Sequence, residues 1–131
     1  MELRFTVWQF VRLMVHLEER RDAATSPRAN ELALLDAWSY VWTPLDQDLA
    51  RLAESDPDGY AEMMMDQEVV FEDATAKQAA TAAATLVAVM SQMDREIEVG
   101  GDKTLIDSLK FERRELRQLT RKLERQAQTP A

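Results

Sequence analysis

The 131-residue sequence contains no cysteine, a single histidine and only three glycines. Without cysteine there are no disulfides, zinc–thiolate sites, iron–sulfur clusters or cysteine nucleophiles. One histidine excludes multi-histidine metal sites and disfavours a Ser-His-Asp hydrolase. That histidine, His16, falls on the polar stripe of a predicted helix, so we expect it to be exposed. The composition offers little catalytic chemistry, and we predict no cofactor.

Long apolar runs are also scarce. The longest extends from Phe5 to Leu17 and is interrupted by Arg12 and His16. It is too short to span a membrane, which takes about 20 apolar residues, and the N-terminus lacks the pattern of a signal peptide. We therefore expect a buried helix here, and a cytoplasmic protein that does not associate with membranes.

Helix-start signals divide the chain clearly. Two capping boxes begin at Thr6 and Thr75. Three capping residues precede prolines, at Ser26-Pro27, Thr43-Pro44 and Asp56-Pro57, and the Gly100-Gly101 pair closes a helix. The second proline and Thr75 also fit kinks within longer helices. The predicted helices cover 7–23, 27–43, 44–55, 57–73, 76–99 and 103–126.

No segment shows sustained alternation of β-branched residues. Leu3, Phe5 and Val7 alternate, which indicates a short extended piece, although no partner strand is apparent. The sequence predicts an all-α fold, a compact antiparallel helical bundle of four to six helices. We expect one domain over 1–131, a frayed tail over 125–131, and a possible homodimer through the first or last helix.

Charge is unevenly distributed along the chain. The formal net charge is −8, but it comprises +1 for residues 1–29, −13 for residues 30–102 and +4 for residues 103–131. Such a split predicts two electrostatically distinct surfaces, an acidic body and a basic C-terminal helix, either of which could receive a partner.

The last predicted helix carries two opposed stripes. Its apolar seam comprises Leu105, Leu109, Leu116, Leu119 and Leu123, with Glu112 placed among them. On the other side lies what we call the basic ridge: Lys110, Arg114, Arg117, Arg121 and Arg125. The ridge fits a solvated helix face, a docking surface for an acidic partner or a second copy, or a phosphate-binding surface. The net negative charge disfavours nucleic acid as the ligand.

The acidic middle of the chain supports two further interpretations. A helix over 57–73 would place Glu62, Asp66 and Asp73 on one stripe. The dense carboxylates of the whole acidic middle could imitate nucleic-acid charge and block a basic groove on a target. They are Asp46, Asp48, Asp56, Asp58, Glu62, Asp66, Glu68, Glu72 and Asp73. Alternatively, they could bind magnesium in a phosphohydrolase of the all-α carboxylate type. The candidate ligands are Glu62, Asp66, Glu68, Glu72 and Asp73.

The function that the sequence favours is non-enzymatic. We predict a small acidic protein that acts through protein–protein interaction as an adaptor, regulator or inhibitor. The candidate partner-binding residues are Arg114, Arg117, Arg121, Arg125, Glu62, Asp66 and Asp73. Magnesium-dependent phosphohydrolysis and weak nucleic-acid contact through the basic helix remain the alternatives.

Overall fold

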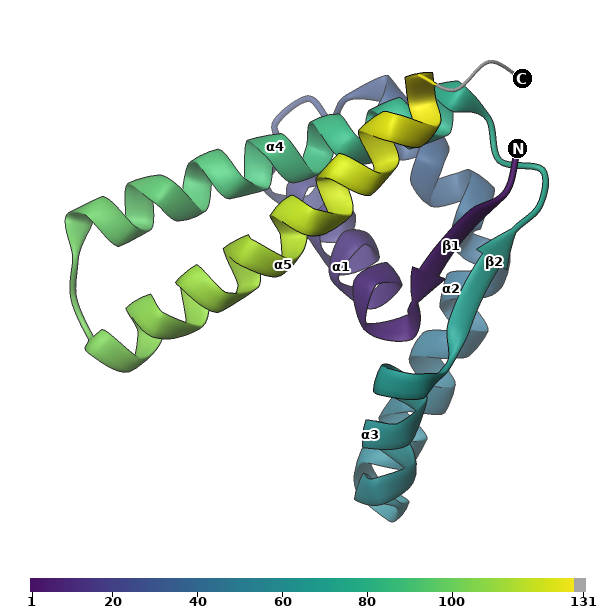
Figure 1. Cartoon of the computed structure of the whole chain (residues 1–131), viewed down its shortest axis with the longest axis horizontal. Helices are drawn as coiled ribbons and strands as arrows, with labels where there is room; N and C mark the ends of the chain where they lie inside the picture. Colours follow the sequence, from purple (N-terminus) through teal and green to yellow (C-terminus); the bar gives the residue numbers. More distant parts are fainter. Residues whose placement is uncertain (129–131) are drawn as a thin grey trace. The chain divides into compact units, whose positions relative to one another are not determined.

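A computed structural model of the chain describes residues 1–128 (Figure 1). In this range there are five helices and two strands, and the predicted all-α class is confirmed. The helices are α1 (Val7–Ala23), α2 (Ala29–Ser55), α3 (Pro57–Asp66), α4 (Ala76–Val99) and α5 (Lys103–Gln128). The strands are β1 (Leu3–Thr6) and β2 (Glu68–Phe71). The chain divides into two compact units, Met1–Ala74 and Thr75–Ala131; the single-domain boundary stays a prediction.

The predicted helix caps are confirmed at three starts. At α1 the Gln9 backbone N–H donates to the Thr6 hydroxyl at 3.1 Å, and the Thr6 N–H donates to the Gln9 side chain at 2.9 Å. Thr75 and Gln78 form the same reciprocal pair at the start of α4, with both distances 3.0 Å. The Asp56 carboxylate accepts from a backbone N–H in the first turn of α3. These bonds satisfy N–H groups that have no partner within their own helix.

The other two proline signals do not start helices: Ser26-Pro27 precedes α2 without beginning it, contrary to the prediction, whereas Pro44 lies inside α2, as the alternative of a longer helix predicts. α2 begins at Ala29 without a side-chain cap and continues through Pro44, so segments 27–43 and 44–55 form one helix. A proline inside a helix removes one hydrogen bond. Pro44 nevertheless lies on the exposed side of α2, and buried positions on the other side continue past it. These are Leu34, Leu35, Trp38, Trp42, Leu45 and Leu49. Burial of this continuous stripe outweighs the missing bond.

The segment predicted as a helix over 57–73 is instead α3 followed by β2. β2 pairs antiparallel with β1, so that Leu3 lies opposite Phe71 and Phe5 lies opposite Val69. The strand alternates in exposure, with Val69 and Phe71 buried and Val70 outward. The extended piece around Leu3 is therefore confirmed, and β2 is the partner strand that the sequence did not reveal.

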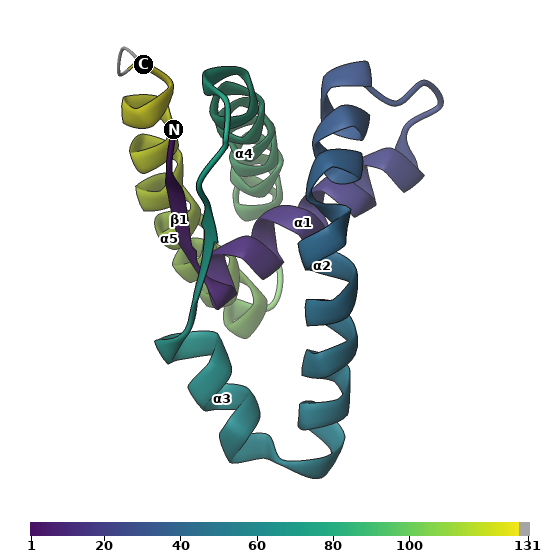
Figure 2. The same cartoon turned by 90° about the vertical axis from the view of Figure 1, so that its right-hand side faces the viewer.

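An aromatic cluster forms the core of the first unit, whose helices α1 and α2 are labelled in Figure 2. Phe71 of β2 stacks on Trp38 of α2, with ring centroids 4.6 Å apart and an interplanar angle of 15°. Phe5 precedes the Thr6 cap and Phe10 follows in the first turns of α1, and their ring centroids lie 5.8 Å apart, which is the arrangement of a hydrophobic staple. Phe10 also meets Trp42 edge-on at 6.1 Å. Aromatic contacts thus join both strands and the first two helices around one centre.

The second unit is a helical hairpin made of α4 and α5. Gly100 and Gly101 close α4 with φ of +82° and +134°, values that side chains with a Cβ rarely adopt. Asp102 then accepts from the Thr104 backbone N–H at 2.7 Å and starts α5. The two helices pack together, and three leucines of the predicted seam are completely buried: Leu116, Leu119 and Leu123.

Two other predictions concern membrane association and the C-terminal tail. Within residues 1–128, no helix combines the length and hydropathy that crossing a bilayer requires. α5 extends to Gln128. The frayed tail over 125–131 stays a prediction, and its last residues, 129–131, lie outside the described residues.

Candidate functional site

The charge split follows the two units closely. The first unit carries 16 acidic and 6 basic side chains, a net charge of −10. The second carries 8 acidic and 10 basic side chains, a net charge of +2. Each unit holds one helix whose outer face concentrates its own sign, α3 in the first and α5 in the second. These two helix faces are the candidate functional surfaces.

The basic ridge lies on the exposed face of α5, and all five of its side chains are exposed. From Lys110 to Arg125 it extends about 22 Å along the helix axis at 1.5 Å per residue. Lys110, Arg114, Arg117 and Arg121 make no hydrogen bond or ion pair with any described residue. Four adjacent cations are therefore available to an anionic partner.

A neighbouring arginine, Arg113, differs from these four cations because it has a partner. Arg113 lies between the ridge and the seam, and its guanidinium donates to both oxygens of Asp94 on α4. This hydrogen bond lowers the pKa of Asp94 below its ordinary value, aided by the charge of Arg113. Glu112, placed within the seam, is half-buried. The hairpin thus uses Arg113 to hold its two helices together, whereas Lys110, Arg114, Arg117 and Arg121 of the ridge make no such contact with a described residue.

The acidic face of α3 consists of Asp58, Glu62 and Asp66, which we call the acidic stripe. The three residues are four positions apart and lie opposite Met64, the buried residue of α3. All three are exposed and have no hydrogen-bond or ion-pair partner among residues 1–128. Like charges at i,i+4 destabilise a helix, and Asp66 ends α3, where the helix dipole disfavours an anion. An external cation would relieve both effects.

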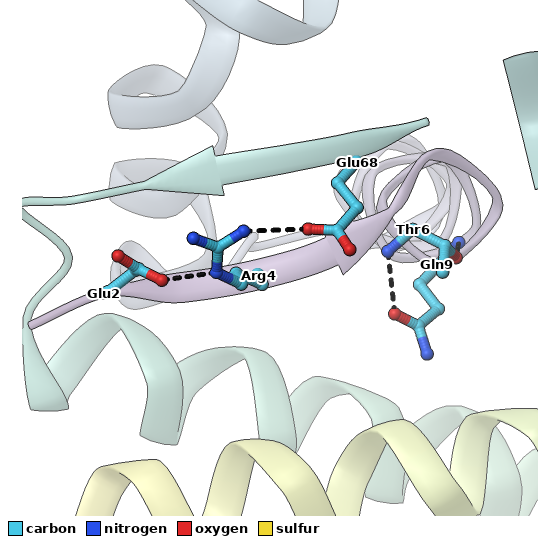
Figure 3. A network of polar contacts seen from close by, with 5 residues as sticks. All are labelled: Glu2, Arg4, Thr6, Gln9 and Glu68. Carbon is cyan, nitrogen blue, oxygen red and sulfur yellow. Dashed lines mark hydrogen bonds and ion pairs between the residues drawn. The ribbon is translucent and has the colours of Figure 1, made fainter. Parts of the chain in front are cut away.

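Asp73 does not belong to this stripe, which corrects the prediction. Because α3 ends at Asp66, Asp73 lies beyond β2, in the turn that follows it. Glu68 is the first residue of β2 and forms an ion pair with Arg4 of β1 (Figure 3). The Arg4 Nη1 and Glu68 Oε2 atoms are 3.1 Å apart. Arg4 also donates to Glu2, and the hydrogen bonds that its guanidinium donates to these two carboxylates raise the pKa of Arg4. Of the three carboxylates that the sequence predicts on one stripe, Glu62 and Asp66 lie on α3 and Asp73 lies elsewhere.

The proposed magnesium ligands are separated for the same reason. Glu62 and Asp66 lie on α3, whereas Glu72 and Asp73 follow β2. Among the residues that the structure describes, no three histidine, aspartate or glutamate side chains gather as a metal ion would require. The carboxylate set of the phosphohydrolase interpretation is not assembled in this part of the chain.

The lone histidine is buried, whereas we expected it to be exposed. His16 retains 8% of its exposure, and its Nδ1 lies 3.7 Å from the Glu19 carboxylate. The buried arc of α1 is wider than the apolar residues alone suggest, and it includes this position. Met65 on α3, by contrast, is an apolar side chain that is 71% exposed.

An open pocket of about 480 Å³ lies where the ends of α4 and α5 meet their connecting loop. Its apolar lining comes from Val99, Leu105, Ile106 and Leu109. One of its polar residues, Arg95, is hydrogen-bonded to Gln92 within α4. The pocket brings together no nucleophile and base, so we place the functional surfaces on the charged helix faces. Comparisons of the chain with protein families, curated proteins and solved structures found no match.

Proposed function

We propose that this chain is a non-enzymatic interaction protein, an adaptor or regulator whose basic ridge on α5 binds an acidic surface of another protein. The observation that carries the proposal is the row of four exposed cations without partners among the described residues. Unneutralised charges of one sign steer a complementary surface into contact and fix its orientation. The proposal includes the cytoplasmic location that the sequence analysis expects.

A protein partner fits the ridge better than nucleic acid does. Binding to a phosphate backbone is dominated by charge neutralisation, and the complete chain carries −8. Single-strand binding also uses several aromatic side chains on which bases stack, whereas Phe111 is the only aromatic residue of α5. An acidic patch on a folded protein presents fewer negative charges than a phosphate backbone does, so the acidic first unit repels it less.

A capture experiment tests the proposal. The full chain is immobilised and exposed to lysate of its source cells, beside the ridge variant R114E/R117E/R121E. The control R28E/R51E/K77E changes the net charge equally at exposed positions off the ridge. We expect wild type and control to retain acidic proteins that elute with salt, and the ridge variant to retain about tenfold less.

Two outcomes would contradict it. If the ridge variant captures the same proteins as wild type, the ridge is a solvated face without a binding role. If nuclease treatment of the lysate abolishes capture, nucleic acid is the ligand and the protein-binding proposal fails.

A second candidate rests on the first unit and its net charge of −10. The acidic stripe could present a surface resembling nucleic acid to a basic groove on a target, which would make the protein an inhibitor. In the same experiment D58K/E62K/D66K would then lose basic partners that the ridge variant retains. Recovery of acidic partners alone would exclude this candidate.

A further inference from the structure

Four cations of the basic ridge, Lys110 to Arg121, and the acidic stripe share a second feature besides their lack of partners among the described residues. An exposed apolar side chain flanks each of them. Met65 lies beside the stripe on α3 and is 71% exposed, and Phe111 lies beside Arg114 on α5 and is 56% exposed. A thioether against an aromatic ring is a favourable contact. Each surface thus has charges of one sign and one large apolar group beside them.

The spacing of the charges also matches. Successive carboxylates of the stripe are four residues apart, about 6 Å along the helix axis. Successive cations of the ridge are three or four residues apart, about 4.5–6 Å. Two helices lying side by side can therefore place Asp58, Glu62 and Asp66 opposite three adjacent ridge cations. No such match exists on the outer face of α2, whose exposed acids Asp36, Asp46 and Glu54 are eight or more residues apart.

We infer that the occupant of the basic ridge is the acidic stripe of a second copy of this chain, with Met65 of one copy against Phe111 of the other. The inference rests on the proposed function of the ridge as a surface that binds acidic protein, and it adds a second copy of the chain to the proteins that the ridge takes. A two-fold axis would make the contact twice and close a dimer, whereas head-to-tail contacts would leave a charged face uncovered at each end. Self-association then competes with any other acidic protein for the ridge.

The contact relieves a cost within each helix. The carboxylates of α3 repel one another, and α3 contains no basic residue. The ridge cations repel one another in the same way. Exposed ion pairs contribute little singly and are screened by salt. The dimer should therefore be weak, concentration-dependent and salt-sensitive.

Charge exchange between copies tests the inference. Sedimentation velocity of the full chain at low salt should show a mass rising from 15.0 kDa toward twice that value with concentration. Both D58K/E62K/D66K and R114E/R117E/R121E should weaken self-association at least about tenfold, because each places like charges opposite one another. An equimolar mixture should restore the dimer, since each variant then meets its complement in the other. The control D36K/D46K/E54K changes exposed acids of α2 and should dimerise as wild type does.

The outcomes are decisive once circular dichroism shows that each variant is helical. A wild-type chain that stays monomeric, a dimer that survives both reversals, or a mixture that stays monomeric overturns the inference. If the wild type is monomeric while the ridge variant still loses its captured acidic proteins, the proposed function stands and only self-association fails. If capture and association both resist the ridge variant, both proposals fail.

Discussion

Individual side chains fix where the helices begin. The Thr6 hydroxyl accepts from the Gln9 backbone N–H, so Thr6→Ala should lower the free energy of unfolding by about 1 kcal/mol. Thr43 is the matched control, because it is an exposed threonine inside α2. Thr43→Ala should raise stability slightly, since alanine favours a helix interior. Urea titration of both variants would measure the difference, and equal effects would contradict a capping role for Thr6.

The contact between Arg113 and Asp94 should make stability depend on pH. Arg113 lowers the pKa of Asp94 in the folded chain. The contribution of the pair is therefore complete above the unfolded value of about 3.9 and is lost as pH falls through the lower folded value. Asp94→Asn should destabilise the protein at pH 7, and its difference from wild type should disappear under strong acid. Urea unfolding across this range provides the test; a difference that persists under strong acid would contradict it.

At the scale of elements, the strand β2 distinguishes the structure from the helix expected over 57–73. Phe71 is 4% exposed and stacks on Trp38, whereas Val70 faces outward at 38%. Phe71→Ala should therefore cost roughly 3–5 kcal/mol, and Val70→Ala less than about 1 kcal/mol. Denaturant unfolding followed by tryptophan fluorescence compares the two variants. Similar large losses at both positions would indicate a helical register instead.

Local signals explain how much of the fold was predictable. The capping residues Thr6, Thr75 and Asp56 act on N–H groups within three residues, so the sequence alone identifies those helix starts. β2 depends on pairing with β1, more than 60 residues earlier in the chain. Continuity through Pro44 depends on burial of a long stripe. Neither condition is visible within a short window of sequence.

The candidate site is likewise predictable only where its residues lie on one continuous helix. The basic ridge lies on one uninterrupted helix, so its helical spacing alone predicts which side chains share a face. Helical spacing predicts Asp73 on the same stripe as Glu62 and Asp66 only if the helix continues past Asp66, where α3 ends. The position of Asp73 instead depends on β2, which separates it from α3. His16 was misplaced because its burial depends on the packing around α1 rather than on the polarity of the residue.

At the scale of the molecule, the net charge of −8 combines two units of opposite sign, −10 and +2. Each has one helix face with exposed charges that lack partners among residues 1–128, namely Asp58, Glu62 and Asp66 on α3 and Lys110, Arg114, Arg117 and Arg121 on α5. These faces are the proposed docking surfaces, and the basic ridge on α5 is the principal one. Screening by salt should therefore weaken binding at the ridge without unfolding the chain.

A dilution series of the isotope-labelled wild-type chain tests most directly whether the basic ridge and the acidic stripe bind each other between copies. The measured quantity is the amide NMR chemical shift at low salt. Concentration-dependent shifts should lie on α5 at Lys110–Arg121 and on α3 at Asp58–Asp66, and should disappear when salt is added. Amides at the exposed acids of α2 provide the internal reference. Shifts confined to other surfaces, or no shift at any concentration, would contradict self-association through these two faces.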